Sequence, residues 1–129
     1  MQPKVRFVLP CDDIRQEMNG KFILIGLYSE AFVPERLPTP VRLVLALFVD
    51  IDEPGVYALE LELRHDSATP PSAVLRLEFE ASAPTKQALI PIPPASLLIG
   101  QPGDLTVHYG PDKVEIMRLA ITRPNATAS

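Results

Sequence analysis

Three segments of the chain alternate between apolar and charged or polar residues. In "VYALELELR", Leu59, Leu61 and Leu63 alternate with two glutamates and an arginine. The same alternation runs through residues 74–81 and 105–109. A period of two places successive side chains on opposite faces of a β-strand, whereas a helix would spread these leucines around its circumference. The three segments therefore predict strands with one face on a core and one face in water.

Two further segments are apolar on both faces. "KFILIGLY" covers residues 21–28, and "VRLVLALFV" covers residues 41–49. Strands that read as continuous apolar runs are typically covered on both sides. We therefore expect both segments to be central strands, covered by the opposite sheet or by a partner.

The last apolar run changes phase part-way along. Val114 and Ile116 fall on one parity, while Leu119 and Ile121 fall on the other. One extra residue in a strand moves the side chains that follow it to the other face. We expect a β-bulge near residues 116–118, which would keep both pairs facing inward.

Prolines separate these apolar runs. The chain has 15 prolines in 129 residues, more than twice the average share of about 5%. Proline breaks helices but is tolerated in turns, at strand starts and on sheet edges. The chain therefore reads as about eight strands, at residues 3–9, 21–29, 41–50, 55–64, 73–81, 86–91, 104–109 and 113–122.

This pattern predicts an all-β fold, a two-sheet antiparallel sandwich of immunoglobulin-like character. A small closed β-barrel is the alternative. Residues 1–123 are expected to form a single domain, followed by a flexible C-terminal tail at 124–129. Within the domain, residues 91–103 read as a polyproline-like connection followed by a short apolar stretch that crosses one end.

Composition argues against two classes of partner. The formal net charge is −4 and the isoelectric point is about 5.1, so we do not expect nucleic acid as a partner. No apolar run reaches the roughly 18 residues of a membrane helix, and we do not expect a membrane partner either. The lone Cys11 cannot form a disulfide within the chain, which favours a reducing compartment, the cytoplasm.

The stretch "PCDDIRQEMNGKFILIGLY", residues 10–28, holds the most distinctive chemistry. Asn19-Gly20 is a strong signal for a two-residue hairpin, because both positions of a type I′ turn need positive φ. We expect a short strand that turns there and returns as the apolar run. The competing structure is one helical turn capped by Asp13. Asp12 and Asp13 lie where the first strand ends, and short carboxylates commonly accept backbone N–H bonds at such places.

Part of this stretch resembles a known family. "CDDIRQE", then "NGK" and "LIGLY", resembles an uncharacterised bacterial family known only as a domain of unknown function. Its members carry a C-D-D-[IV]-R-x-E element, then G-K and L-I-G-[IVLF]-[YF]. The resemblance is specific over residues 7–28 and loose beyond them. It implies a small bacterial β-domain and no particular activity, so no functional residue is carried over.

The same stretch offers a candidate site made of Cys11, Asp12, Asp13, Arg15 and Glu17. Nucleophilic catalysis would need a thiolate, a histidine base and a carboxylate that orients the base. A structural role is favoured, because free cysteine is often buried as a small apolar residue. Adjacent aspartates on an extended chain also point to opposite faces, which makes them a poor acid–base pair. We expect Cys11 to be buried on an inward row with Val5, Phe7 and Leu9.

The two histidines are the other candidates for chemistry. His65 or His108 would be the base for Cys11, and a metal site could combine His65 and Asp66 with the carboxylates of the opening stretch. The chain contains no D-x-D-x-D-G loop and no H-x-H pair. We expect no metal and no other cofactor, with His65 at a strand end and His108 facing outward.

The second face of residues 41–49 suggests an interface. Val44, Ala46 and Phe48 lie on that face, and an apolar patch of this size usually marks an interaction surface. A homodimer or a protein partner would cover it; the alternative cover is the proline-rich segments 32–40 and 91–103. We therefore expect a non-catalytic bacterial protein-interaction or self-associating module. A small Cys/Asp-dependent or metal-dependent enzyme and a structural protein of a phage or other particle are the alternatives.

Overall fold

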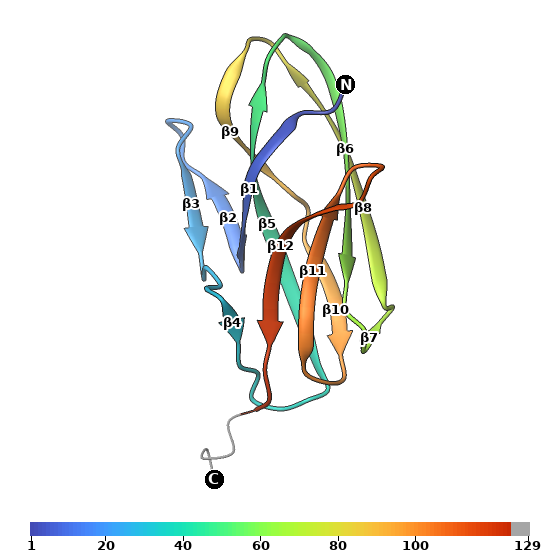
Figure 1. Ribbon diagram of the computed structural model, residues 1–129. Helices are drawn as coiled ribbons and strands as arrows, with labels where there is room; N and C mark the ends of the chain where they lie inside the picture. The colour runs from blue at the N-terminus through green and yellow to red at the C-terminus, as the bar shows by residue number, and fades with distance from the viewer. Residues whose placement is uncertain (125–129) are drawn as a thin grey trace.

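The computed structural model describes residues 1–124, and every regular element among them is a β-strand (Figure 1). The strands are β1 (Lys4–Cys11), β2 (Asp13–Gln16), β3 (Phe22–Ile25), β4 (Ala31–Phe32), β5 (Thr39–Ile51), β6 (Gly55–Arg64), β7 (Ala68–Thr69), β8 (Ser72–Ala81), β9 (Thr85–Pro91), β10 (Ala95–Ile99), β11 (Gly103–Tyr109) and β12 (Val114–Ile121). Of the predicted C-terminal tail, residues 125–129 lie outside the described part.

The strands form two five-stranded sheets and one separate hairpin. The first sheet has the order β1-β5-β10-β7, with β9 also paired to β5. The second has the order β4-β12-β11-β6-β8, and β2 pairs only with β3. All pairs are antiparallel except β4 with β12, which is parallel. The predicted all-β sandwich is confirmed, and among residues 1–124 neither sheet closes into the alternative barrel.

The core lies between the two large sheets. It is made mostly of aliphatic side chains at alternate positions of the long strands, as the period of two predicts. β5 contributes Val41, Leu43, Leu45, Leu47, Val49 and Ile51, and β6 contributes Tyr57, Leu59, Leu61 and Leu63. β11 and β12 add Leu105, Val107, Leu119 and Ile121.

The two segments that are apolar on both faces have different fates. The segment 41–50 is the central strand that the sequence predicts: β5 pairs with β10 over its first half and with β1 and β9 over its second half. The prediction for 21–29 is wrong. Only the four residues of β3 are a strand there, and they belong to the separate hairpin (Figure 1).

The proline-rich segment 91–103 also differs from its prediction. Ala95–Ile99 is not a loose crossing but the strand β10, which pairs with β5 and then with β7. Its alternate residues Ala95, Leu97 and Ile99 are buried in the core. The cluster of prolines at 91–94 ends immediately before β10. The edge strand β9 and the buried strand β10 are therefore only a few residues apart in the chain.

Bulges in β12 and β1 set which of their side chains face the core. In β12, Val107 of the partner strand pairs with Met117 and His108 pairs with Glu115, so Ile116 is the extra residue. The predicted bulge is confirmed, but Val114 is exposed rather than inward. A second bulge interrupts the β1–β5 ladder between Val5 and Phe7.

Candidate functional site

β2 and β3 form the hairpin that the sequence predicts around Asn19-Gly20. The turn itself differs from type I′, because only Gly20 has positive φ, at +89°. The N–H of Gly20 donates to the carbonyl of Glu17 at 3.0 Å, and the N–H of Glu17 donates to the carbonyl of Lys21 at 2.7 Å. These bonds define a longer loop with glycine in the left-handed region. The competing helical turn is absent from residues 1–124.

The outward side of β3 is apolar and exposed. Ile23 and Ile25 are 43% and 42% exposed, and Leu27 just beyond the strand is 55% exposed. We call these three residues the hairpin surface. With Met18 at the loop and Val33 after β4, segment 18–33 holds five of the eleven large hydrophobic side chains exposed in the described part of the chain. Clustered exposure of this kind marks interaction sites far more often than single exposed leucines do.

Gly26 lies within the hairpin surface, between Ile25 at the end of β3 and Leu27. Its φ is +65°, and a Cβ there would meet the carboxylate of Asp12. The N–H of Asp12 donates to the carbonyl of Ile25 at 2.9 Å, and the N–H of Tyr28 donates to the carbonyl of Pro10 at 2.9 Å. The start of β2 and the end of β3 are thereby fixed to the end of β1.

The acidic residues of the stretch 10–28 make their hydrogen bonds close to this hairpin. Asp13 accepts from the N–H of Ile14 at 2.9 Å and from Nε of Arg15 at 3.2 Å. The carbonyl of Asp12 accepts from the guanidinium of Arg42 at 2.7 Å. Burial, followed by the charge of Asp12, raises the pKa of Tyr28 to about 12. Among residues 1–124, Glu17 makes backbone hydrogen bonds only.

Cys11 is fully buried, as the sequence predicts. Its thiol donates to the carbonyl of Val44, with Sγ and O 3.3 Å apart. Burial raises the pKa of the thiol; the charges of Asp12 and Asp13 act in the same direction, and a backbone hydrogen bond at Asp13 opposes them. A thiol held neutral in this way is a poor nucleophile.

The row on which Cys11 lies is not the predicted inward row. The bulge after Val5 turns the rest of β1 over, so that Val8 faces the core. Phe7, Leu9 and Cys11 face the opposite side of the sheet, where they lie beside Phe48, Ala46 and Val44 respectively.

The face predicted to need a partner is largely covered by the chain itself. Val44 and Ala46 are 4% and 0% exposed, because β1 and β9 flank this part of β5 and β2 lies against it. Phe48 is partly exposed and stacks on Phe7, with ring centroids 4.4 Å apart. The interface at Val44 and Ala46 was expected because this apolar face was predicted to lack cover within the chain, and that expectation is wrong for these two residues. The alternative cover is corrected too: β10, within 91–103, lies in the sheet rather than over it.

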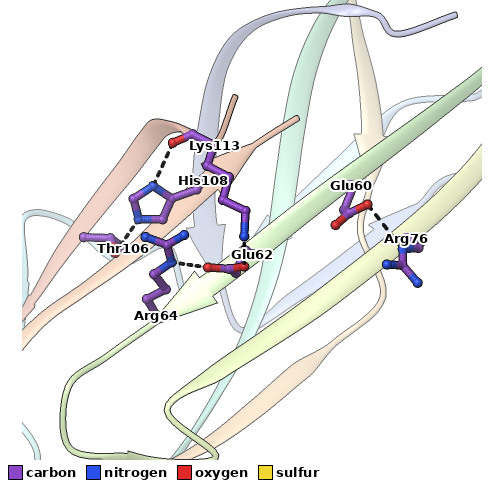
Figure 2. Close-up of polar contacts among 7 residues, drawn as sticks. All are labelled: Glu60, Glu62, Arg64, Arg76, Thr106, His108 and Lys113. Carbon is purple, nitrogen blue, oxygen red and sulfur yellow. Dashed lines mark hydrogen bonds and ion pairs between the residues drawn. The ribbon is translucent and has the colours of Figure 1, made fainter. Parts of the chain in front are cut away.

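The outer face of the second sheet is charged, and several of its charges are paired (Figure 2). Glu62 accepts from Nζ of Lys113 at 2.9 Å and pairs with Arg64, and these two cations lower the pKa of Glu62. Arg76 pairs with Glu60 at 3.2 Å. This face is therefore a solvated, salt-bridged surface.

Both histidines lie in or beside this second sheet and have partners. Nδ1 of His108 lies 3.2 Å from the carbonyl of Lys113, to which it can only donate, so in the neutral ring Nε2 accepts from the Thr106 hydroxyl at 3.0 Å (Figure 2). His65 is 3% exposed, and its Nδ1 accepts from the N–H of Ser67 at 3.1 Å. Nε2 of His65 has no hydrogen-bond partner in the described residues. Neither histidine belongs to the sheet that holds Cys11, so the alternative of a catalytic Cys11 with a histidine base is not assembled.

Two hollows on the surface lie beside the second sheet, and Cys11 lines neither of them. One of about 520 Å³ lies between Met1 and the outer face of β6 and β8. Another of about 360 Å³ is lined by His65, His108 and Arg118, among others, and Arg118 is already paired with Asp104 and Glu115. In residues 1–124, no three His, Cys, Asp or Glu side chains are grouped so that they could hold a metal ion. The same residues include no helix with the length and apolar character needed to cross a membrane.

Comparison with known proteins gives no relative for this chain. No family model, no curated protein and no solved structure matches it. The resemblance of residues 7–28 to an uncharacterised bacterial family stays a prediction. The candidate surface is therefore defined by the structure alone.

Sequence reasoning missed the hairpin surface, although one signal for it was present. An isolated glycine inside an apparent strand often marks a bulge or a close approach of two backbones. Gly26 is such a glycine, in contact with Asp12, and it ends β3 after four residues. If Gly26 is taken as the end of the strand, the apolar run becomes shorter, and there is no longer a reason to expect residues 21–29 at the centre of a sheet.

Proposed function

We propose that the protein is a non-catalytic module that binds a protein partner through the hairpin surface. The observation that carries this proposal is the exposure of Ile23, Ile25 and Leu27 on an element that stands apart from both large sheets. Full burial of a single isoleucine or leucine side chain is worth about 1.5–3 kcal/mol. Three such side chains in one place supply an apolar centre of the kind that protein interfaces use.

The edge of β3 adds a second means of attachment. β3 pairs only with β2, so its other edge presents unpaired backbone groups. An extended peptide can add to such an edge, with main-chain hydrogen bonds giving affinity and alternate side chains giving specificity. The polar neighbours Asp13 and Arg15, which lie across from Ile25 and Ile23, would form the rim.

The chemistry around Cys11 supports a binding role over a catalytic one. The thiol is buried, with a raised pKa, and its hydrogen bond goes to a backbone carbonyl. The proposal retains a bacterial origin, which rests on the resemblance of residues 7–28, and a cytoplasmic location, which rests on the lone cysteine.

Site-specific photo-cross-linking tests the proposal. A photoreactive phenylalanine analogue placed at Ile25 should give a discrete adduct with one protein in cells that naturally express the chain. The same analogue at Val114, an exposed apolar residue of β12, is the matched control and should not give that adduct. The variant Ile23→Ser/Leu27→Ser, carrying the analogue at 25, should lose it. Adducts that are identical at both positions, or absent from both, would contradict a binding site on the hairpin.

A further inference from the structure

β8 is a long edge strand. It pairs with β6 along one edge, and no other strand of the described residues pairs with its other edge. It ends its sheet and pairs with β6 over all ten residues without a register shift. Figure 1 shows it at the outer margin of the molecule. A long, flat, uninterrupted edge is a template for pairing with another strand.

The other edge strands of the two large sheets carry features that block such pairing. β1 has a bulge and a proline, Pro10. β9 contains Gln87 at φ 53° and ends at Pro91. β4 and β7 have two residues each. Prolines, bulges and short strands are the usual protections of sheet edges, and β8 has none of the three.

The ladder between β6 and β8 shows which backbone groups of β8 are free. The N–H of His65 donates to the carbonyl of Pro71 at 3.1 Å, in the same register as the ladder. Hydrogen-bonded and non-hydrogen-bonded pairs alternate along an antiparallel ladder. The odd-numbered residues of β8 therefore bond to β6, and the N–H and C=O groups of Val74, Arg76, Glu78 and Glu80 point away from the sheet.

The sequence of this free edge is complementary to itself. If a second copy pairs antiparallel about a two-fold axis at Leu77, Arg76 lies opposite Glu78 of the other copy, and this charge pair occurs twice. Val74 then lies opposite Glu80, and all of these positions have outward backbone groups. An axis at residue 76 or 78 would instead place Arg76 or Glu78 opposite itself, and like charges directly opposite are destabilising.

The inward side of β8 fits the same register. Leu75, Leu77 and Phe79 face the core but are only half-buried, because no strand lies beyond them. With the axis at Leu77, this residue lies beside its own copy and Leu75 lies beside Phe79. The apolar row of one sheet would then continue into the other.

We propose that two copies of this chain associate by antiparallel pairing of their β8 strands, with the two-fold axis at Leu77, to join their five-stranded sheets into one. Such an interface is isologous and closes at the dimer. It lies on the second sheet, away from the hairpin, so it stands or falls independently of the proposed partner binding.

Charge reversal tests the register. Sedimentation velocity over a concentration series should show a monomer–dimer equilibrium for the wild type. Arg76→Glu and Glu78→Arg should each remove the dimer, because each places like charges opposite one another. The double variant Arg76→Glu/Glu78→Arg restores opposite charges across the axis and should restore the dimer. A wild type that is monomeric throughout, or single variants that dimerise like the wild type, would overturn the proposal.

Two further variants separate the interface from folding. Val74→Pro removes an N–H that does not bond to β6, so it should keep the monomer folded by circular dichroism and abolish the dimer. Leu77→Cys should cross-link the two copies on mild oxidation, because Cα atoms of a non-hydrogen-bonded pair lie about 4.5 Å apart, within the range of a disulfide. Leu75→Cys is the control and should not cross-link. A Leu75→Cys dimer without a Leu77→Cys dimer, or a Val74→Pro chain that still dimerises, would also overturn the proposal.

Discussion

β5 and β3 have the same kind of sequence and opposite surroundings. Both read as apolar on the two faces, yet β5 is buried on both faces over residues 43–47 while β3 exposes Ile23 and Ile25. The difference arises from length and neighbours: β5 has thirteen residues and three partner strands, and β3 has four residues and one. An apolar run therefore predicts that both faces of a strand are covered, but it does not predict whether the same chain covers them.

A charge on each strand tests this comparison most severely. Val44→Glu would place an unpaired carboxylate on the covered face of β5, and we expect it to lower the free energy of unfolding by about 4 kcal/mol or more. Ile25→Glu on the hairpin surface should change it by less than about 1 kcal/mol. Urea denaturation followed by circular dichroism measures both. Comparable losses in the two variants would show that the hairpin surface is buried in solution.

Truncation of a side chain on each strand gives the next largest difference. Leu45 is almost fully buried in the core, so Leu45→Ala should cost about 2–5 kcal/mol through lost burial and the cavity left behind. Ile23→Ala should cost less than about 1 kcal/mol, because nearly half of that side chain is already in water. Thermal and urea unfolding of the two variants would check this ratio, and a costlier Ile23→Ala would contradict the exposed hairpin.

The glycines at the two ends of β3 test how the hairpin is held. Gly26→Ala should cost about 2 kcal/mol or more, because the φ of +65° disfavours a Cβ and that Cβ would displace the carboxylate of Asp12. Gly20 also has positive φ but open space around it, so Gly20→Ala should cost only about 1 kcal/mol. Equal unfolding free energies for the two variants would show that the contact with Asp12 does not fix the hairpin.

Alkaline titration is the mildest test of the same anchor. The pKa of Tyr28 is raised to about 12 in the folded chain, from an ordinary value of 10.0. Between these two values the unfolded chain loses the phenol proton and the folded chain keeps it, so stability is full below pH 10 and falls as the pH rises.

Tyr28→Phe should therefore make the fall between pH 10 and pH 12 shallower. Tyr109, whose pKa burial also raises to about 12, should continue to contribute in that variant. Melting temperatures across this range provide the measurement. An unchanged slope in Tyr28→Phe would show that the phenol of Tyr28 is solvated in the folded chain.

Much of the candidate site could be anticipated from local sequence. The hairpin followed from Asn19-Gly20, and the burial of Cys11 followed from the frequency with which free cysteine is buried. The face on which Cys11 lies did not follow. The bulge after Val5 adds one residue to β1, and a shift by one residue moves every later side chain to the other face. No local feature of the sequence announces that extra residue.

By itself the sequence determined the class of fold and the four long strands of the second sheet, β6, β8, β11 and β12. The alternation of Leu59, Leu61 and Leu63 with charged residues fits only a strand with one buried face. Side chains of a strand alternate between its two faces, so the leucines share one face and the charged residues share the face in water. Three outcomes were decided only by the tertiary structure. They are what covers the second face of β5, which strands β10 pairs with, and the separation of β3 from both large sheets. Those outcomes depend on contacts between segments distant in the chain, and an apolar side chain gains the same free energy from any neighbour that excludes water.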